Sequence, residues 1–316
     1  MKIIKFFVAC ILVLLLTVCQ KETQTNNKQQ KENQTPTKYD IALVMKTLTN
    51  PFFITMERGA REAEKDFNIN LIVKTGSQET AIAQQIDIIR KLIKDEVDAI
   101  VIAPAGSIEL VPILAQAQQA GIVIVNIDNE LDTETCNKYN LVNVPFISVN
   151  NEEGAYLSVK HIIENVTKQT KAVILEGITS ARNSIDRKKG ALKAFQENKN
   201  IKVVASETAN WKIDEAYEVF KNIWKEHKHI DLVFCANDMM ALGVVQFLQE
   251  NNINDVKLAS FDNIEEIKPH LKSGAVSVTI DQQGDVQGYK GTETAYKLLN
   301  NEPIESTSVN VIVVTD

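Results

Sequence analysis

From residue 39 onward, short aliphatic runs alternate with longer amphipathic segments. Residues 41–45 form an apolar run, and a helical pattern follows over about residues 51–67. A second predicted helix, residues 80–96, places isoleucines on one face at helical spacing. The aliphatic runs lack polar alternation, which is typical of parallel strands covered by helices on both faces. This half of the pattern predicts an α/β fold.

The same rhythm resumes after an irregular stretch at residues 131–143. Further strand-like runs, separated by helical segments, occupy residues 172–175, 203–205, 232–234, 258–261, 276–280 and 309–314. So many strands exceed what one doubly wound sheet usually holds. We therefore predict two Rossmann-like lobes with parallel sheets, whose ligands would lie beyond the carboxyl ends of the strands.

The amino terminus has the pattern of an export signal. Lys2 and Lys5 precede an uncharged apolar run at residues 6–18, which is shorter than the roughly 18 to 20 residues of a spanning helix. The run ends in Leu-Thr-Val-Cys at residues 16–19, which resembles a bacterial lipobox but has Val18 where Gly, Ala or Ser is preferred. We predict a signal peptide at residues 1–18 and lipidation of Cys19. An uncleaved anchor and ordinary signal cleavage remain as alternatives.

A polar segment follows the cysteine. Residues 20–38 contain no aliphatic or aromatic side chain, so they cannot bury enough apolar surface to offset the entropy of ordering. We expect residues 19–38 to form a lipidated flexible tether between a membrane and the folded body. The protein would then be exported and held in the cell envelope or periplasm as a membrane-anchored lipoprotein.

Composition and motifs exclude several classes of function. A formal charge of -7 argues against a nucleic-acid binder. The sequence contains no hydrolase, zinc-protease or phosphate-loop motif, and its histidines lack metal-ligand spacing. We therefore expect no enzyme activity, no cofactor and no metal. Of the body cysteines, Cys235 lies in an apolar run typical of a buried thiol, and its pairing with Cys136 is left open.

Polar and aromatic side chains follow most of the predicted strands. Such residues can bind a neutral polyol, because carboxylates, amides and guanidinium groups bond hydroxyls while aromatic rings cover C–H faces. The candidates are Asn50, Phe52, Phe53, Asp128, Asn129, Asn183, Arg187, Trp211, Asn237, Asp262 and Gln282. Structural roles compete with this interpretation, since Asp262 could cap a helix, the phenylalanines could be core residues and Arg187 could lie on the surface.

Six motifs in order along the chain occupy residues 49–53 (TNPFF), 103–107, 186–190, 237–243 (NDMMALG), 260–263 (SFDN) and 279–283. Together they resemble the ribose-binding protein family of periplasmic sugar-binding proteins. The resemblance implies a type 1 periplasmic binding fold, in which a three-stranded hinge joins the lobes near Val149, Gln282 and Val311. It implies an N-terminal lobe at residues 39–149 plus 283–311 and a C-terminal lobe at residues 150–282 plus 312–316.

The resemblance also implies roles for the candidate residues. Asn50 would hydrogen-bond the sugar, the Phe52–Phe53 pair would stack on its ring, and Trp211 would cover the opposite face. The remaining polar contacts would come from Asp128, Arg187, Asn237, Asp262 and Gln282, with Asn183 where glucose and galactose binders carry a carboxylate. Ribose binders have Arg where this chain has Asn129, and Asn where it has Ala103. A sugar other than ribose is therefore expected.

Together these features predict the substrate-binding lipoprotein of a carbohydrate ABC importer. The protein would be a monomer that captures a monosaccharide or related polyol between hinged lobes and docks on the transporter's membrane subunits. An alternative is a receptor for a sugar or sugar-like signal in chemosensing without transport. A repressor's effector lobe would need a DNA-binding motif ahead of Tyr39, and an enzyme would need a nucleophile or metal set.

Overall fold

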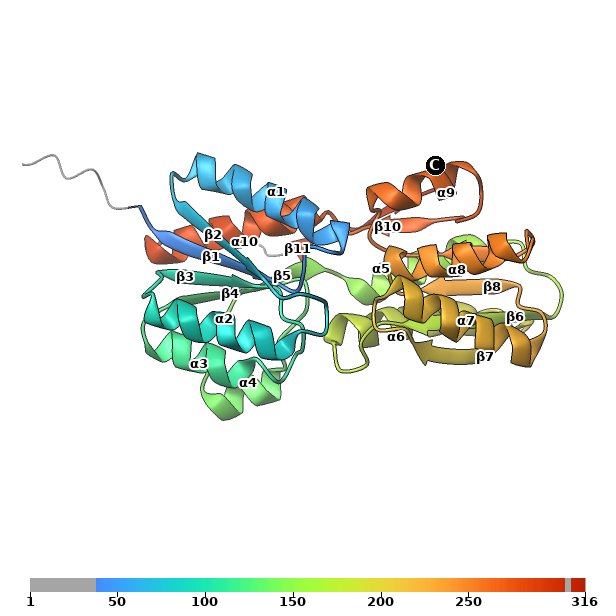
Figure 1. The fold of residues 1–316 in the computed structure, drawn as a ribbon, viewed down its shortest axis with the longest axis horizontal. Coiled ribbons are helices and arrows are strands. Elements are labelled where there is room, and N and C mark those ends of the chain that lie inside the picture. The colour runs from blue at the N-terminus through green and yellow to red at the C-terminus, as the bar shows by residue number, and fades with distance from the viewer. Residues whose placement is uncertain (1–37, 305–307, 316) are drawn as a thin grey trace, which may run out of the picture. The chain divides into compact units, whose positions relative to one another are not determined.

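The computed structural model describes residues 38–304 and 308–315 (Figure 1). The predicted signal peptide, the predicted lipidation site Cys19 and residues 19–37 of the predicted tether lie outside the described residues. Among the residues described, no helix combines the length and apolarity needed to cross a bilayer.

The first lobe is built on a six-stranded parallel sheet in the order β2-β1-β3-β4-β5-β11. Its strands are β1 (Asp40–Met45), β2 (Asn70–Thr75), β3 (Ala99–Ile102), β4 (Val123–Ile127), β5 (Phe146–Val149) and β11 (Ser308–Val309). The helices of this lobe are α1 (Pro51–Asp66), α2 (Ile82–Lys94), α3 (Val111–Gln119), α4 (Thr133–Tyr139) and α10 (Gly284–Leu299). In Figure 1, α1 and α10 cover one face of the sheet and α2 and α3 cover the other.

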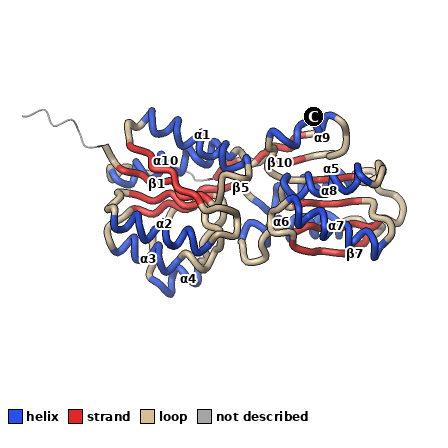
Figure 2. Tube along the Cα trace, in the orientation of Figure 1, coloured by secondary structure: helices blue, strands red, loops and turns tan. Residues whose placement is uncertain are grey.

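The second lobe repeats this arrangement with a four-stranded parallel sheet in the order β7-β6-β8-β9 (Figure 2). Its strands are β6 (Thr170–Glu176), β7 (Ile201–Thr208), β8 (Leu232–Cys235) and β9 (Lys257–Ala259). The helices are α5 (Asn151–Ile163), α6 (Arg182–Gln196), α7 (Ile213–His227), α8 (Asp238–Glu250) and α9 (Lys268–Lys272), with a short 3₁₀ turn, η1 (Glu265–Ile267). Both lobes therefore share the strand order 2-1-3-4 of a doubly wound sheet.

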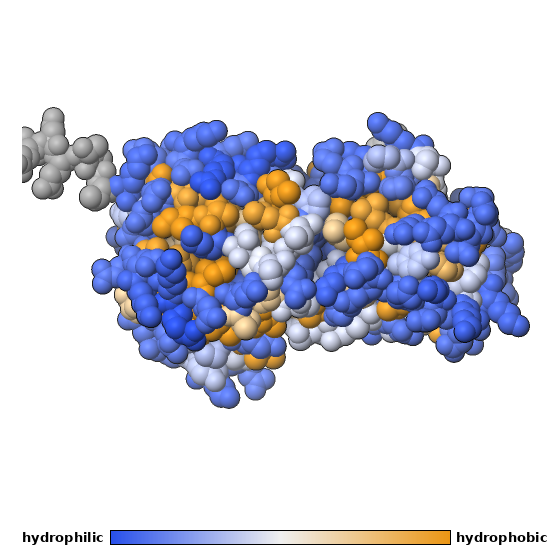
Figure 3. Space-filling model, in the orientation of Figure 1, coloured by the Kyte–Doolittle hydropathy of each residue, from blue (hydrophilic) through white to orange (hydrophobic). Residues whose placement is uncertain are grey.

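Strand β1 shows why the sheets need helices on both sides. Ile41 and Leu43 are fully buried in the core that includes Met56 of α1, whereas Ala42 and Val44 are fully buried in a separate core under α2 and α3. Because successive side chains of a strand point to opposite faces, an uninterrupted apolar run needs two covered faces. On the side shown in Figure 3, hydrophilic residues dominate the surface, with hydrophobic residues visible between them.

Within residues 38–304 and 308–315, the chain passes between the two lobes three times. It leaves the first lobe after β5, returns after β10 (Thr279–Asp281) into α10, and leaves again between β11 and β12 (Ile312–Val314). Strands β10 and β12 pair antiparallel with each other. The residue boundaries given above for the lobes stay a prediction.

The two body cysteines are free thiols. Cys235 is fully buried in β8, and burial raises the pKa of its thiol well above its usual range. Cys136 in α4 is half-buried, and burial raises its pKa as well.

Candidate functional site

The loops at the carboxyl ends of the strands converge on a cavity of about 220 Å³. This volume includes space open to solvent, and in this conformation the side chains leave room for about one water molecule. Every predicted contact residue except Asn129 lines it. The lining residues are Lys46, Asn50, Phe52, Phe53, Glu79, Asp128, Asn183, Arg187, Trp211, Asn237, Asp262 and Gln282.

The start of α1 supplies the aromatic part of the first-lobe wall. Asn50 caps the helix by accepting a hydrogen bond from the Phe52 backbone N–H at 3.1 Å, and Pro51 occupies the first turn, where its fixed φ suits a helix. The rings of Phe52 and Phe53 meet edge to face at 5.1 Å. Gly284 makes room for Phe52, because a Cβ at that position would lie 2.7 Å from the ring. The local sequence thus fixes both rings at the cavity.

A buried ion pair forms the charged part of this wall. The Lys46 ammonium lies 2.7 Å from Asp128 Oδ2, and the two side chains are 2% and 3% exposed. Lys46 immediately follows β1, and its ammonium also lies 5.5 Å from the centre of the Phe53 ring. Asp128 follows β4 with a φ of +63°, a left-handed conformation that a non-glycine residue rarely adopts.

Glu79 is a second buried carboxyl group in the first-lobe wall. It lies between β2 and α2, and its Oε1 accepts a hydrogen bond of 2.8 Å from Asn50 Nδ2. Burial raises the pKa of Glu79, while the charge of Lys46 and the Asn50 hydrogen bond oppose the shift. Lys46 and Glu79 are not among the contact residues predicted from the sequence. Both follow a strand, so extending the strand-end rule to β1 and β2 could have found them.

Arg187 organises the second-lobe wall. Its guanidinium stacks on Phe261, with the central carbon 3.7 Å from the ring centre. It donates hydrogen bonds to Asn151 Oδ1 (2.8 Å), the Ala236 carbonyl (2.8 Å), Gln282 Oε1 (3.2 Å) and Asp262 Oδ1 (3.4 Å). Burial lowers the pKa of Arg187, and the nearby carboxylates counteract that shift. Arg187 is therefore a buried pocket residue, not a surface residue.

Asp262 follows β9 and is held from two sides. Besides Arg187, Gln282 donates to Asp262 Oδ1 at 2.6 Å. Burial raises the pKa of Asp262 well above its usual range, and Arg187 opposes this shift. The residue has a φ of +124°, an uncommon backbone conformation typical of functional sites. No helix begins at Asp262, because η1 starts at Glu265, so its side chain is not a simple helix cap.

Two buried polar atoms at the cavity lack a partner. Among residues 38–304 and 308–315, Asn183 Oδ1 and Trp211 Nε1 are buried without a hydrogen bond. Trp211 packs on Gly177, where a Cβ would lie 2.0 Å from the indole. Because buried polar atoms are normally hydrogen-bonded, an unpaired acceptor and an unpaired donor in one cavity indicate a polar ligand.

Asn237 and Asp238 have different tasks. Asn237 lines the cavity and also caps α8, accepting a hydrogen bond from the Met240 backbone N–H at 2.9 Å. Asp238 is fully buried behind the cavity, and its carboxylate accepts hydrogen bonds from Ser260 Oγ (2.5 Å), Thr279 Oγ1 (2.8 Å) and the Ile264 N–H (3.0 Å). Asp238 therefore braces the loop that carries Asp262.

The position of Asn129 does not support its predicted role as a ligand contact. Asn129 is fully buried, yet it lies outside the group of residues that line the cavity. Its amide donates to the Pro104 carbonyl at 3.1 Å and to Ser107 Oγ at 3.3 Å, and its Oδ1 accepts from the Asn183 backbone N–H at 3.2 Å. The side chain is thus directed to protein partners in this structure.

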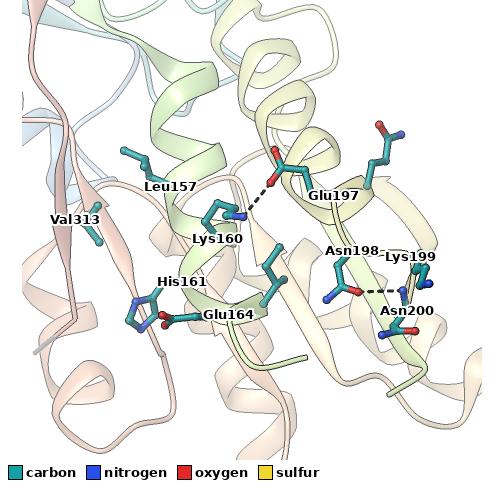
Figure 4. Close-up of a pocket in the computed structure, with 11 residues that line it drawn as sticks. Leu157, Lys160, His161, Glu164, Glu197, Asn198, Lys199, Asn200 and Val313 are labelled. Carbon is teal, nitrogen blue, oxygen red and sulfur yellow. Dashed lines mark hydrogen bonds and ion pairs between the residues drawn. The ribbon is translucent and has the colours of Figure 1, made fainter. Parts of the chain in front are cut away.

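A larger hollow of about 1450 Å³ lies between the carboxyl-terminal ends of α5 and α6 (Figure 4). Its charged residues are exposed, and Lys160 pairs with Glu197 at 2.9 Å. Exposed ion pairs contribute little free energy, and the hollow is lined by helix ends and by Val313 of β12 rather than by loops at the carboxyl ends of the parallel strands. We therefore assign the functional site to the enclosed cavity. Among the residues described, no three His, Cys, Asp or Glu side chains are grouped so that they could hold a metal ion.

Several known proteins are similar to this chain over most of its length. A D-ribose/D-allose-binding protein of Pseudomonas aeruginosa is 36% identical over 282 residues, which cover 88% of each protein. A solute-binding protein of an ABC transporter from Actinobacillus succinogenes, solved with bound D-allose, is 36% identical with a TM-score of 0.81 and covers 88% of this chain and 97% of its own. A solute-binding protein from Burkholderia multivorans is 35% identical with a TM-score of 0.83, covering 88% and 99%.

These matches confirm the predicted fold and the resemblance to periplasmic sugar-binding proteins. Residues 41–303 match the periplasmic binding protein domain, which is most of the chain. The relative from Pseudomonas aeruginosa is named as a sugar-binding protein, and the one from Burkholderia multivorans as a solute-binding protein of an ABC transporter. The chain belongs to the periplasmic binding protein family and has its type 1 two-lobed fold.

Proposed function

We propose that this protein captures a monosaccharide in the cavity between its lobes and delivers it to a carbohydrate ABC importer. The observation that carries the proposal is the meeting of unpaired buried polar atoms with aromatic rings from both lobes in one enclosed cavity. Trp211 Nε1 and Asn183 Oδ1 are poised to bond hydroxyls, and Phe52 and Phe53 supply apolar surface. The relatives named for D-ribose and D-allose support the same ligand class.

The wall chemistry explains how a neutral sugar would be held. Carboxylates at Glu79, Asp128 and Asp262 accept hydrogen bonds from hydroxyls, and Lys46 and Arg187 donate to hydroxyl or ring oxygens. A sugar ring between the phenylalanines and Trp211 would place its C–H faces on aromatic surface. A sugar that lacks one hydroxyl would leave a buried partner unpaired, which gives the site its selectivity.

The departures from ribose-binding proteins favour a ligand other than ribose alone. Ala103 is fully buried and has no polar side chain, and Asn129 is committed to protein partners. Lys46 and Glu79 supply charged contacts in the same wall. We infer that the ligand belongs to the aldose class that includes ribose and allose.

Binding would couple to closure of the lobes. A ligand that contacts both walls binds the closed arrangement more tightly and shifts the population toward it in proportion to that preference. The closed form would then dock on the transporter's membrane subunits, with the protein acting as a monomer.

The test is calorimetric titration of purified protein with ribose, allose, xylose, glucose, galactose and myo-inositol. We expect saturable binding of at least one aldose and loss of that binding in Asp262→Ala. The matched control is Asp255→Ala, an exposed carboxylate, which should bind as the wild type does. Failure of every sugar to bind, or unchanged affinity in Asp262→Ala, would overturn the assignment. Uptake of the labelled sugar by cells that lack the gene separates import from sensing.

We also propose that Cys19 is acylated and tethers the exported protein to a membrane. The proposal is supported by the basic start, the short apolar run and the lipobox-like tetrad. Metabolic labelling with a fatty acid should mark the wild type and not Cys19→Ala. Label that survives this substitution contradicts the proposal.

A further inference from the structure

The amino end of α6 lies at the boundary between the lobes without a cap from its own segment. The residue before the helix is Ala181, which has no side-chain oxygen, whereas α1 and α8 each begin with a capping asparagine. The first backbone N–H groups of a helix have no partner within the helix, so they need acceptors from elsewhere. Ala181 is fully buried and Asn183 is 4% exposed, whereas Arg182 between them is exposed.

Two side chains of the first lobe supply these acceptors. The backbone N–H of Arg182 donates to Ser107 Oγ at 3.2 Å, and the backbone N–H of Asn183 donates to Asn129 Oδ1 at 3.2 Å. Both acceptors are buried, Ser107 at 5% exposure and Asn129 at 0%. The loops after β3 and β4 therefore cap a helix that belongs to the other lobe.

The two acceptors are themselves held in place. Asn129 Nδ2 donates to Ser107 Oγ and to the Pro104 carbonyl, which fixes the orientation of its amide. Ser107 also accepts at its backbone carbonyl from the Asp132 N–H at 2.8 Å. Because both oxygens are preorganised, little entropy is lost when the α6 amides reach them.

This capping affects the cavity through α6. The helix carries Asn183, whose unpaired Oδ1 lies at the cavity, and Arg187, which organises the second-lobe wall. Separation of the lobes breaks the bonds to Ser107 and Asn129, so these bonds exist only when the walls are together. They favour the closed arrangement without touching a ligand.

We propose that Ser107 and Asn129 are positioning residues that cap α6 across the lobe boundary and thereby set the affinity of the cavity. The proposal rests on the sugar-binding function proposed above. It also accounts for the asparagine at position 129, whose short side chain reaches the helix end and does not extend into the cavity.

The test compares Asn129→Ala, Ser107→Ala and Asn129→Asp with the wild type. Calorimetry with the aldose that the wild type binds should show affinity weakened by roughly 2- to 30-fold in each alanine variant, the range that loss of one helix cap produces. Asn129→Asp keeps an acceptor oxygen and should retain more affinity than Asn129→Ala. Asn137→Ala, an exposed asparagine of the neighbouring α4, is the matched control and should bind as the wild type does.

Hydrogen exchange of the Arg182 and Asn183 amides gives a readout that does not depend on the sugar. In the wild type these amides should exchange more slowly than in the matching alanine variant. Unchanged exchange and affinity in both alanine variants would overturn the capping proposal. A wild type that binds no sugar but shows the exchange difference would refute the proposed function and leave the cap intact. If one alanine variant fails to fold, the other carries the test.

Discussion

The two walls of the cavity are built in different ways. In the second lobe, Arg187 donates four hydrogen bonds and stacks on Phe261, so that Asp262 and Gln282 belong to one connected network. In the first lobe, the polar groups form separate pairs, Lys46 with Asp128 and Asn50 with Glu79, beside two aromatic rings.

The difference indicates that the two walls have different roles in ligand binding. A connected buried network is rigid when all of its members are satisfied, so the second-lobe wall is preorganised before a ligand arrives. In the first wall, each pair can give up its internal hydrogen bond for one to a ligand hydroxyl without disturbing the other pair. The first wall is therefore suited to discriminating among sugars. Mutations should therefore damage the second wall as a unit and the first wall locally.

The largest expected effect is that of Arg187→Met, which removes the centre of the second wall. The change leaves the buried carboxyl group of Asp262 without its cationic partner. It also leaves the acceptor oxygens of Asn151 and Ala236 without the donor that Arg187 provides. Breaking a buried ion pair in this way typically costs about 3–5 kcal/mol, so we expect a clear fall in the free energy of unfolding and loss of sugar binding. Urea unfolding and calorimetry measure the two effects.

Asp262→Asn combined with Arg187→Met is the control for this prediction. It removes the stranded charge and should recover part of the stability without recovering binding. A single Arg187→Met variant that is as stable as the wild type would show that the second wall is not a connected unit.

A smaller effect is expected from Lys46→Gln in the first wall. The change removes the ion pair with Asp128 but leaves the Asn50–Glu79 pair in place. Loss of one charge-assisted bond to the ligand is worth about 1.5–3 kcal/mol, so affinity should fall roughly 10- to 150-fold with a smaller loss of stability than in Arg187→Met. Equal stability losses in the two variants would contradict the proposed contrast between the walls.

The most gradual expected effect is a pH dependence that originates behind the second wall. Burial raises the pKa of Asp238 to about 7, whereas the same group in the unfolded chain has a pKa of about 4. Between these values the folded protein holds a proton that the unfolded chain has lost, so this group's contribution to stability falls as pH rises from about 4 to 7 and is constant above that. The slope from one group is at most about 1.4 kcal/mol per pH unit.

Chemical unfolding of the ligand-free protein at several pH values measures this slope. In Asp238→Asn, which cannot titrate, the fall in stability over this range should be smaller than in the wild type. An identical pH profile in the two proteins would show that Asp238 titrates normally in the folded state.

Much of this architecture could be predicted from the sequence because parallel α/β sheets have local rules. The apolar runs locate the strands, and the strand-end loops then supply the residues of the cavity, including Asp128 and Asp262. Lys46 and Glu79 were not predicted as contact residues because a single charged residue near a strand end is equally typical of a solvated loop. The role of Asn129 was inaccessible because it depends on where α6 of the other lobe lies, which local patterns do not contain.

The three passages of the chain between the lobes have a consequence for biosynthesis. The four-stranded sheet and its helices, from α5 to β10, form one uninterrupted stretch that is complete once residue 281 has been translated. The first sheet is started earlier, but two of its parts are translated only after residue 281. These are helix α10, which covers the buried Ile127 and Val101, and the edge strand β11. Of the two parallel sheets, the one that is begun first on the ribosome is therefore completed last.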